Sequence, residues 1–254
     1  MDGPQLAADS TTPARGVLEI SRRLSAATAD LAFGPPVAHV YHPLAYAWEA
    51  HAAYVNAYAG LGARVLLVGM NPGPHGMCQT GVPFGDVGMV RDWLGIRARV
   101  GAPAAQHPKR PVLGFAATRG EVSGRRLWGW ASARYGDPRR FFAAFFVWNY
   151  CPLAFLEAGG RNRTPDKLPA AERAALFDAC DTALRGVVAA LGVARVLGVG
   201  NFAAQRARIA LDGAGVELGV TPHPSPASPL ANRDWPGAFE RALAQNGISL
   251  PPRP

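Results

Sequence analysis

The sequence predicts an α/β fold with three layers, α/β/α, in which a four-stranded parallel sheet lies between two layers of helices. Short runs of branched apolar residues recur along the chain, and longer amphipathic stretches separate them. Such runs are typical of strands buried on both faces, and their alternation with helices indicates βαβ units. Apolar residues make up 49% of the 254 residues, which is enough for a single core.

The first half of the chain predicts two helices, a strand and two further helices. The first helix has apolar residues on one face, and Gly60 ends the second. Asp86 and Ser123 can each cap one of the last two helices. In order, the predicted elements are helix 16–33, extended segment 36–43, helix 44–60, strand 64–70, helix 86–94 and helix 123–135.

The second half of the chain predicts three more strands of the same sheet, because FFVWN, RVLGVG and VELGVTP are short and apolar. Three helices alternate with them. A long loop over 150–168 and a loop rich in Pro and Ser over 223–234 connect these elements. In order, the elements are strand 145–149, helix 169–191, strand 195–200, helix 201–213, strand 216–222 and helix 235–246.

The composition favours nucleic acid as a partner but does not decide the matter. Lys plus Arg minus Asp plus Glu is 26 − 18 = +8, and the sequence pI is about 10.0. Such a balance favours polyanionic partners, of which nucleic acid is the commonest. A general preference for arginine would give the same balance. The arginines are scattered along the chain, which predicts a folded basic face and not a charged arm.

The chain predicts one domain over 15–250 that follows a disordered lead over 1–14. The lead lacks the basic and apolar pattern of a secretory signal, and no apolar run approaches the length of a membrane span. The three cysteines are widely spaced and fit neither a disulfide framework nor a four-thiolate metal site. We therefore expect reduced thiols, no membrane partner and a cytoplasmic location, associated with the nucleoid if the source is bacterial.

Three polar residues follow three of the predicted strands. Asn71 follows strand 64–70, Asn149 ends strand 145–149, and His223 follows strand 216–222. Because the carboxyl ends of parallel strands meet at one edge of a sheet, where ligands bind, we expect these residues to lie together. None is a strong acid or base at neutral pH. The pattern predicts chemistry by hydrogen bonds to a leaving group or a water molecule, and not by a charged nucleophile.

The long loop after Asn71 supports a site at this edge. It runs through NPGPHGMCQTGVPFGD, whereas a strand-to-helix connection needs only about 2–6 residues. A competing motif, GVGNFA at 198–203 with Glu217 beyond it, has the outline of a dinucleotide fingerprint. It lies on the third strand and not on the first. We prefer a tight turn at Gly200 and Asn201, whose helix N-terminus could hold a backbone phosphate.

Long motifs in this chain closely resemble the single-strand-selective monofunctional uracil-DNA glycosylases, a family of the uracil-DNA glycosylase superfamily. The resemblance extends from Tyr41 to about residue 246. It is carried by GMNPGPHGMCQTGVPFGDVGMVRDWLGI (69–96), HPKRPVLGF (107–115), EVSGRRLWGW (121–130), FFVWNYCPLAFL (145–156), GRNRTPDKLPA (160–170), GVGNFAAQRAR (198–208) and HPSP (223–226).

The resemblance implies a repair enzyme that hydrolyses the N-glycosidic bond of uracil and of 5-substituted uracils such as 5-hydroxymethyluracil. Its substrates would be single- and double-stranded DNA, and it would leave an abasic site without cutting the strand. The family's fold, a four-stranded parallel sheet between helices, is the fold predicted above. The resemblance implies no cofactor and no metal, and we expect a monomer.

The resemblance also implies a role for each site residue. Asn71 would position the attacking water, and His223 would donate a hydrogen bond to O2 of the departing uracil. The uracil would be held by a stacking ring, an amide that reads its Watson–Crick edge, backbone groups and a side-chain wall: Phe84, Asn149, Met70, Gly73 and Met77. DNA contacts would come from two loops: Ser225, Ala227, Ser228, Asn232 and Arg233, with Gly200 and Asn201.

This chain departs from the family's pattern at two places. Ala227 and Ser228 stand where family members have an arginine and an asparagine, and His75 stands where an aromatic ring is expected and could adjust the room around C5 of uracil. Other functions stay open from the residues alone. They are a superfamily glycosylase for deaminated purines (hypoxanthine or xanthine), a non-catalytic module that binds single-stranded DNA, and a dinucleotide-dependent oxidoreductase.

Overall fold

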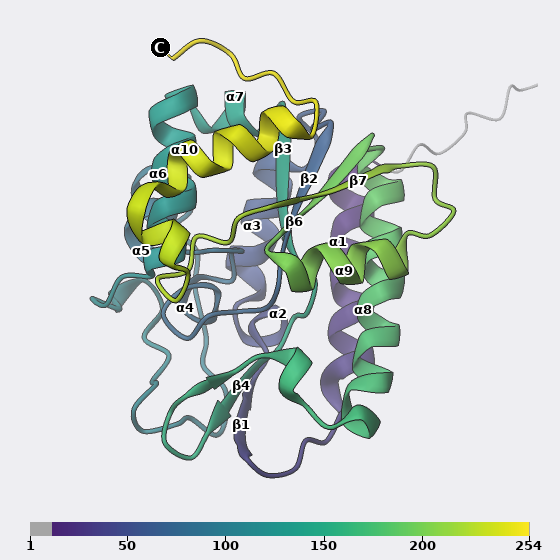
Figure 1. The fold of residues 1–254 in the computed structure, drawn as a ribbon. Coiled ribbons are helices and arrows are strands. Elements are labelled where there is room, and N and C mark those ends of the chain that lie inside the picture. The colour runs from purple at the N-terminus through teal and green to yellow at the C-terminus, as the bar shows by residue number, and fades with distance from the viewer. Residues whose placement is uncertain (1–11, 254) are drawn as a thin grey trace, which may run out of the picture.

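A four-stranded parallel sheet lies at the centre of the molecule (Figure 1), as the sequence predicts. The computed structural model describes residues 12–253. The strands lie in the order β3 (Phe145–Asn149), β2 (Val65–Gly69), β6 (Arg195–Val199) and β7 (Glu217–Thr221), all parallel. Every residue of β2 and β3 is buried, which explains why both are apolar except for Asn149 at the end of β3.

Helices cover both faces of this sheet, so the predicted three-layer α/β/α architecture is confirmed. On one side, α1 (Pro13–Ala29) and α8 (Ala170–Leu191) run side by side, and α9 (Asn201–Ala210) packs on β6. The other side in Figure 1 holds α5 (Val87–Asp92), α6 (Val122–Tyr135), α7 (Pro138–Phe142) and α10 (Pro229–Gln245). Helix α3 (Trp48–Tyr58) packs against α1.

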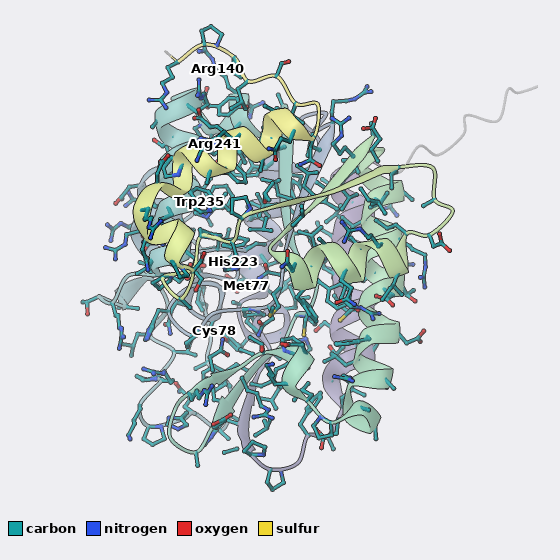
Figure 2. All side chains as sticks on the ribbon, viewed as in Figure 1. Met77, Cys78, Arg140, His223, Trp235 and Arg241 are labelled. Carbon is teal, nitrogen blue, oxygen red and sulfur yellow. The ribbon has the colours of Figure 1, made fainter. Side chains whose placement is uncertain are left out.

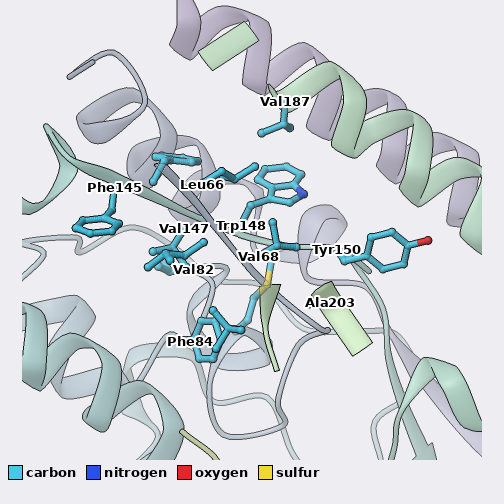
Figure 3. Packing of buried hydrophobic residues seen from close by; sticks show 14 of the residues in the cluster. Leu66, Val68, Val82, Phe84, Phe145, Val147, Trp148, Tyr150, Val187 and Ala203 are labelled. Carbon is cyan, nitrogen blue, oxygen red and sulfur yellow. The ribbon is translucent and has the colours of Figure 1, made fainter. Parts of the chain in front are cut away.

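The core lies between the sheet and its helices. Figure 3 shows Leu66 of β2 and Trp148 of β3 among other buried apolar side chains, with Val187 of α8 above them. Phe84 comes from the long loop after β2 and packs at one end of the same cluster. One continuous core therefore extends to the loop that the sequence places at the functional edge.

A second, antiparallel sheet was not predicted. It consists of β1 (Val37–Tyr41), β4 (Ala154–Glu157) and β5 (Asn162–Arg163), and β4 and β5 lie in the segment predicted as a loop over 150–168. These strands are short and carry Gly and Asn between them, so their own pattern is that of a turn. They pair only because the fold brings residues 37–41 beside residues 154–157.

Several helix boundaries also differ from the prediction. Residues 44–60 form two helices, α2 (Pro43–Tyr46) and α3. Asp86 caps α5 as predicted, since its Oδ1 accepts a hydrogen bond from the Met89 N–H at 3.2 Å. The Ser123 cap is wrong, because α6 begins at 122 and is capped by Glu121. Two short helices, α4 (Met77–Thr80) and α7, and the 3₁₀ turns η1 (Gly114–Ala116) and η2 (Pro165–Lys167), lie in segments without a predicted element.

The ends of the predicted domain can be compared with the structure only in part. Residues 1–11 of the predicted lead lie outside the described residues. The predicted boundary at 15 falls inside α1, which begins at Pro13 behind a Thr12 cap. Near the other end, Arg134 Nη1 donates a hydrogen bond to the carbonyl of Pro251 at 3.2 Å. No helix between residues 12 and 253 has the length and apolar character that a membrane crossing requires.

Candidate active site

A pocket of about 400 Å³ opens where the strands of the parallel sheet end. All seven residues predicted for catalysis and base binding line it: Met70, Asn71, Gly73, Met77, Phe84, Asn149 and His223. Figure 2 shows two of them, Met77 and His223, near the centre of the molecule. The strand-end argument concerned Asn71, Asn149 and His223, and these three do lie together, because β2, β3 and β7 end at the same edge.

Asn149 lies at the end of β3, and only 6% of its surface is exposed. Its Nδ2 donates a hydrogen bond to Sδ of Met77 at 3.3 Å. On the neighbouring strand, Gly69 lies opposite Asn149. A Cβ on Gly69 would collide with Oδ1 of Asn149 and lie 2.7 Å from the Phe84 ring. Glycine at this position therefore allows the amide and the aromatic ring to meet at the floor of the pocket.

Asn71 is oriented by the chain that follows β3. Its Nδ2 donates a hydrogen bond to the carbonyl of Leu153 at 3.1 Å. The two strand ends are joined by backbone hydrogen bonds, from Tyr150 N to the carbonyl of Gly69 and from Cys151 N to the carbonyl of Met70, both 2.9 Å. With the NH₂ group committed to the backbone, Oδ1 is the amide atom available to accept a hydrogen bond from a water molecule.

His223 is held as a neutral hydrogen-bond donor. Its Nδ1 accepts a hydrogen bond from the Ser225 N–H at 3.0 Å, so the neutral ring carries its proton on Nε2. Burial lowers the pKa of His223 to about 4, because the charged ring would lose its hydration. Gly200, with φ +91°, lies behind the ring: a Cβ there would be 3.2 Å from Cβ of His223.

Phe84 has a backbone conformation that aromatic residues rarely adopt. Its φ is 53°, and it is the only non-glycine residue with positive φ among residues 12–253. This conformation costs about 1–2 kcal/mol for an L-residue. Two hydrogen bonds to its carbonyl hold it, from Trp128 Nε1 at 3.0 Å and from Asp86 N at 2.8 Å. The ring lies 5.9 Å from the ring of His223, tilted by 44°.

Other residues of the pocket were not predicted, and Glu121 is the most notable of them. Its Oε2 accepts a hydrogen bond from Gly124 N at 2.6 Å, and its Oε1 accepts one from Ser123 N at 3.3 Å. Burial raises the pKa of the Glu121 carboxyl, and these hydrogen bonds oppose the rise. The sequence held no clear signal for it, because Ser, Thr, Asp and Asn, and not Glu, are the usual helix caps.

The unpredicted second sheet also contributes to the pocket. Asn162 of β5 and Thr164, which follows β5, both line it. The Oδ1 atom of Asn162 is buried and has no hydrogen-bond partner among residues 12–253. GRNRTP gave no chemical signal of its own, and its position at the pocket depends on the pairing of β4 with β5.

The residues predicted to contact DNA separate into three groups. Ser225 lines the pocket, and Gly200, Asn201 and Ser228 line an adjacent depression of about 610 Å³ that includes Arg241 (Figure 2). The others are exposed nearby: Ala227, Asn232 and Arg233. The predicted loop over 223–234 is partly wrong, because α10 begins at Pro229. Ser228 is the cap of α10, and a kink lies at Asp234, two residues before Pro236.

His75 does not line the pocket, so its expected influence on the space around C5 of uracil has no direct contact to support it. Burial lowers the pKa of His75 to about 4, and the nearby charges of Arg119 and Arg110 act in the same direction. Glu121 lines the pocket with a polar side chain, whereas His75 does not line it. Between residues 12 and 253, no three His, Cys, Asp or Glu side chains are grouped so that they could hold a metal ion.

The dinucleotide fingerprint is explained by packing. A Cβ on Gly198 would collide with the backbone of α9 at Ala204, and Gly200 makes room for His223. Glu217 forms an ion pair with Arg195, at the start of β6 and β7. It therefore lies at the opposite end of the strands from the N-terminus of α9, where a fingerprint carboxylate would be needed.

Comparisons with known proteins agree with this geometry. The family model of the uracil DNA glycosylase superfamily matches residues 56–245. Two relatives are single-strand-selective monofunctional uracil-DNA glycosylases: that of Rattus norvegicus is 50% identical and that of Mus musculus 49%. Each match covers 92% of this chain and 85% of the relative. The crystal structure of wild-type Pedobacter heparinus SMUG2 shares the fold, with a TM-score of 0.60 and 16% identity, over 89% of this chain and 96% of that chain.

These matches cover the parallel sheet, the long loop after β2 and the segment that contains His223. The chain belongs to the uracil DNA glycosylase superfamily and, within it, to the family of single-strand-selective monofunctional uracil-DNA glycosylases.

Proposed function

We propose that this protein removes uracil and 5-substituted uracils from single- and double-stranded DNA and leaves an abasic site. The family gives the reaction class, hydrolysis of an N-glycosyl bond by a monofunctional uracil-DNA glycosylase. The observation that carries the proposal is the convergence of three neutral side chains on one pocket: Asn71, Asn149 and His223. The pocket also contains an aromatic ring, Phe84, to stack on a base.

The target nucleotide leaves the base stack and enters the pocket, because its glycosidic bond cannot be reached within a duplex. Phe84 stacks on the face of the uracil. Oδ1 of Asn149 accepts a hydrogen bond from N3–H, and Nδ2 donates one to O4. Cytosine presents the reverse pattern and is rejected, since the contact of Nδ2 with Met77 Sδ favours one orientation of the amide.

Cleavage proceeds by departure of the base as an anion from an oxocarbenium-like sugar. The Nε2–H of His223 donates to O2 and stabilises the negative charge as it develops. Oδ1 of Asn71 accepts a hydrogen bond from the water molecule that attacks C1′. An amide cannot take the proton of this water molecule, so expulsion of the base, and not activation of the nucleophile, supplies most of the rate. Once the water oxygen has bonded to C1′, its proton passes, directly or through solvent, to the uracil anion, which leaves as neutral uracil.

The DNA strand is held by the surface around the pocket. The net charge of +8 favours a polyanion, and Asn201, Ser228 and Arg241 lie beside the pocket in one depression. We expect a monomer that acts without metal or other cofactor. The cytoplasm, with nucleoid DNA as the partner in a bacterial source, is the location that we propose.

An excision assay tests the reaction and its residues. Oligonucleotides with uracil, 5-hydroxymethyluracil, hypoxanthine or xanthine are incubated with the enzyme, with and without EDTA, and abasic sites are cleaved with alkali. We expect EDTA-resistant release of uracil. Asn71→Ala should abolish it, and His223→Ala should reduce kcat about 10²–10³-fold, as loss of an oxyanion donor does.

Asn56→Ala is the matched control, since Asn56 is exposed on α3. It should keep full activity. Release of hypoxanthine or xanthine without uracil would replace the proposal with the deaminated-purine alternative. Binding of single-stranded DNA with no release of any base would favour the non-catalytic alternative.

A further inference from the structure

Glu121 is the only acidic residue that lines the pocket in the described part of the chain, and the mechanism above does not use it. Each of its oxygens accepts one backbone hydrogen bond, from Ser123 or Gly124, at the N-terminus of α6. An ionised carboxylate has about four acceptor sites. The side chain of Ser123 donates a further hydrogen bond to Glu121. Three of the four sites are therefore taken, and one remains on a carboxylate that lines a pocket for a base.

The carboxylate lies against the turn that precedes Met77. A Cβ on Gly76 would lie 2.9 Å from Cγ and 3.3 Å from Oε2 of Glu121, and a Cβ on Gly73 would lie 3.9 Å from Oε1. The absence of a side chain at Gly76 thus allows Glu121 to approach this turn, whereas its contact with position 73 is of ordinary van der Waals length. Gly73, Met77 and Glu121 form one wall of the pocket, which we call the Glu121 wall.

The order of groups around the pocket assigns this wall to C5 of the base. With O2 at His223 and N3 at Asn149, O4 lies at Nδ2 of Asn149. Met77 lies next to that atom, since its Sδ is 3.3 Å from Nδ2. C5 follows C4 around the pyrimidine ring, and the Glu121 wall, which begins at Met77, follows Asn149 around the pocket. A substituent on C5 therefore points toward Glu121.

We propose that Glu121 is a specificity-determining residue that accepts a hydrogen bond from a hydroxyl group carried on C5 of the pyrimidine. This inference rests on the proposed function and adds the determinant of its substrate class. A 5-hydroxymethyl group supplies the donor. A methyl group at the same place removes water from the carboxylate and returns no hydrogen bond, which is costly at a buried polar group. The wall thus selects 5-hydroxymethyluracil and rejects thymine.

The test compares kcat/KM on single-stranded oligonucleotides that carry uracil, 5-hydroxymethyluracil or thymine, so that base pairing does not contribute. The readout is the ratio of 5-hydroxymethyluracil to uracil, which cancels any loss common to both. Glu121→Ser keeps a good helix cap and removes the carboxylate. Glu121→Asp keeps both but draws the carboxylate back. We expect the ratio to fall about tenfold in Glu121→Ser and to fall less in Glu121→Asp.

Asp137→Ser is the control, because Asp137 caps α7 in the same way and does not line the pocket. Its ratio should equal that of the wild type. An unchanged ratio in Glu121→Ser overturns the inference. If that variant does not fold, an unchanged ratio in Glu121→Asp overturns it. A wild type that releases uracil but not 5-hydroxymethyluracil also overturns it, whereas a wild type that releases no uracil refutes the proposed function itself.

Discussion

At the scale of single residues, the chemistry of the site depends on which atoms carry protons. The Ser225 N–H occupies Nδ1 of His223, and burial lowers the pKa of the ring to about 4. The ring is therefore neutral at physiological pH, and its only proton lies on Nε2. An imidazolium would not need the tautomer to be set, but its burial would cost more than the hydrogen bond returns.

This depressed pKa predicts the pH profile of uracil release. We expect kcat on single-stranded uracil DNA to be flat from about pH 8 down to pH 5, and to change only as the pH approaches 4. Uracil is the substrate of choice because it has no C5 hydroxyl for Glu121. A titration in kcat near pH 6.5, the ordinary pKa of histidine, would contradict the neutral-donor role.

The melting temperature must be measured at each pH, because a loss of stability in acid would also lower kcat. Between pH 6.5 and about 4, the unfolded chain binds a proton at position 223 that the folded chain does not. Protons therefore bind the unfolded chain in preference to the folded one. The free energy of unfolding consequently decreases as the pH falls through this window. His51 and His42, whose pKa values burial also lowers to about 4, act in the same direction.

At the scale of elements, the segment 223–226 depends on α6 and α10 for its position. Arg126 of α6 donates one hydrogen bond from Nη1 to the carbonyl of Pro224 and one from Nη2 to Oδ1 of Asn232, both 2.9 Å. Asn232 of α10 in turn donates to the carbonyl of Pro226 at 2.8 Å. The guanidinium thus links the loop that contains His223 to two helices. We therefore expect Arg126 to act as a positioning residue for that histidine.

Loss of this link should reduce catalysis more than stability. We expect Arg126→Ala to lower kcat at least tenfold with little change in KM and only a small change in melting temperature, because its two polar contacts are partly or fully exposed to solvent. Arg126→Lys should restore part of kcat, since it can keep one of the two hydrogen bonds. Arg140→Ala removes the same charge at a remote position on α7 (Figure 2) and should be neutral. Equal losses in both variants would indicate a general charge effect.

At the scale of the whole molecule, we expect the surface beside the pocket to determine how well single- and double-stranded DNA are used. Ala227 is exposed between the pocket and α10, and neither it nor Ser228 has a side chain long enough to enter the gap that a flipped base leaves. Ser228 is in addition committed to its cap, since its Oγ accepts a hydrogen bond from Ala231 N at 3.4 Å. A duplex therefore gains little help in releasing its base.

We expect kcat/KM on a U:A duplex to be well below that on the same single strand. Ala227→Arg should raise the duplex rate several-fold and leave the single-strand rate nearly unchanged, because only the duplex must be opened. Ala227→Leu separates insertion from charge. Comparable rates of the unmodified enzyme on duplex and single strand would contradict this interpretation. All rates must be compared at one salt concentration, because phosphate contacts release counterions.

The sequence by itself determined the parallel sheet and the edge at which the site lies. VLLVG and the FFVW that precedes Asn149 are apolar at every position, and such runs are typical of strands buried on both faces. Once the sheet is known, Asn71, Asn149 and His223 must share its carboxyl edge. Their assigned roles came from the family resemblance, and they stay predictions that the assays above can test.

Tertiary structure alone decided the remaining features, because they depend on contacts between segments distant in sequence. The partner of Asn71 is Leu153, Glu121 packs closely against the turn at Gly76, and β4 and β5 form a sheet with β1. Periodicity and capping signals act over a few residues, so they locate strands and helices. They carry no information on which side chain of one loop approaches the backbone of another, and that proximity sets the proton positions and the shape of the pocket.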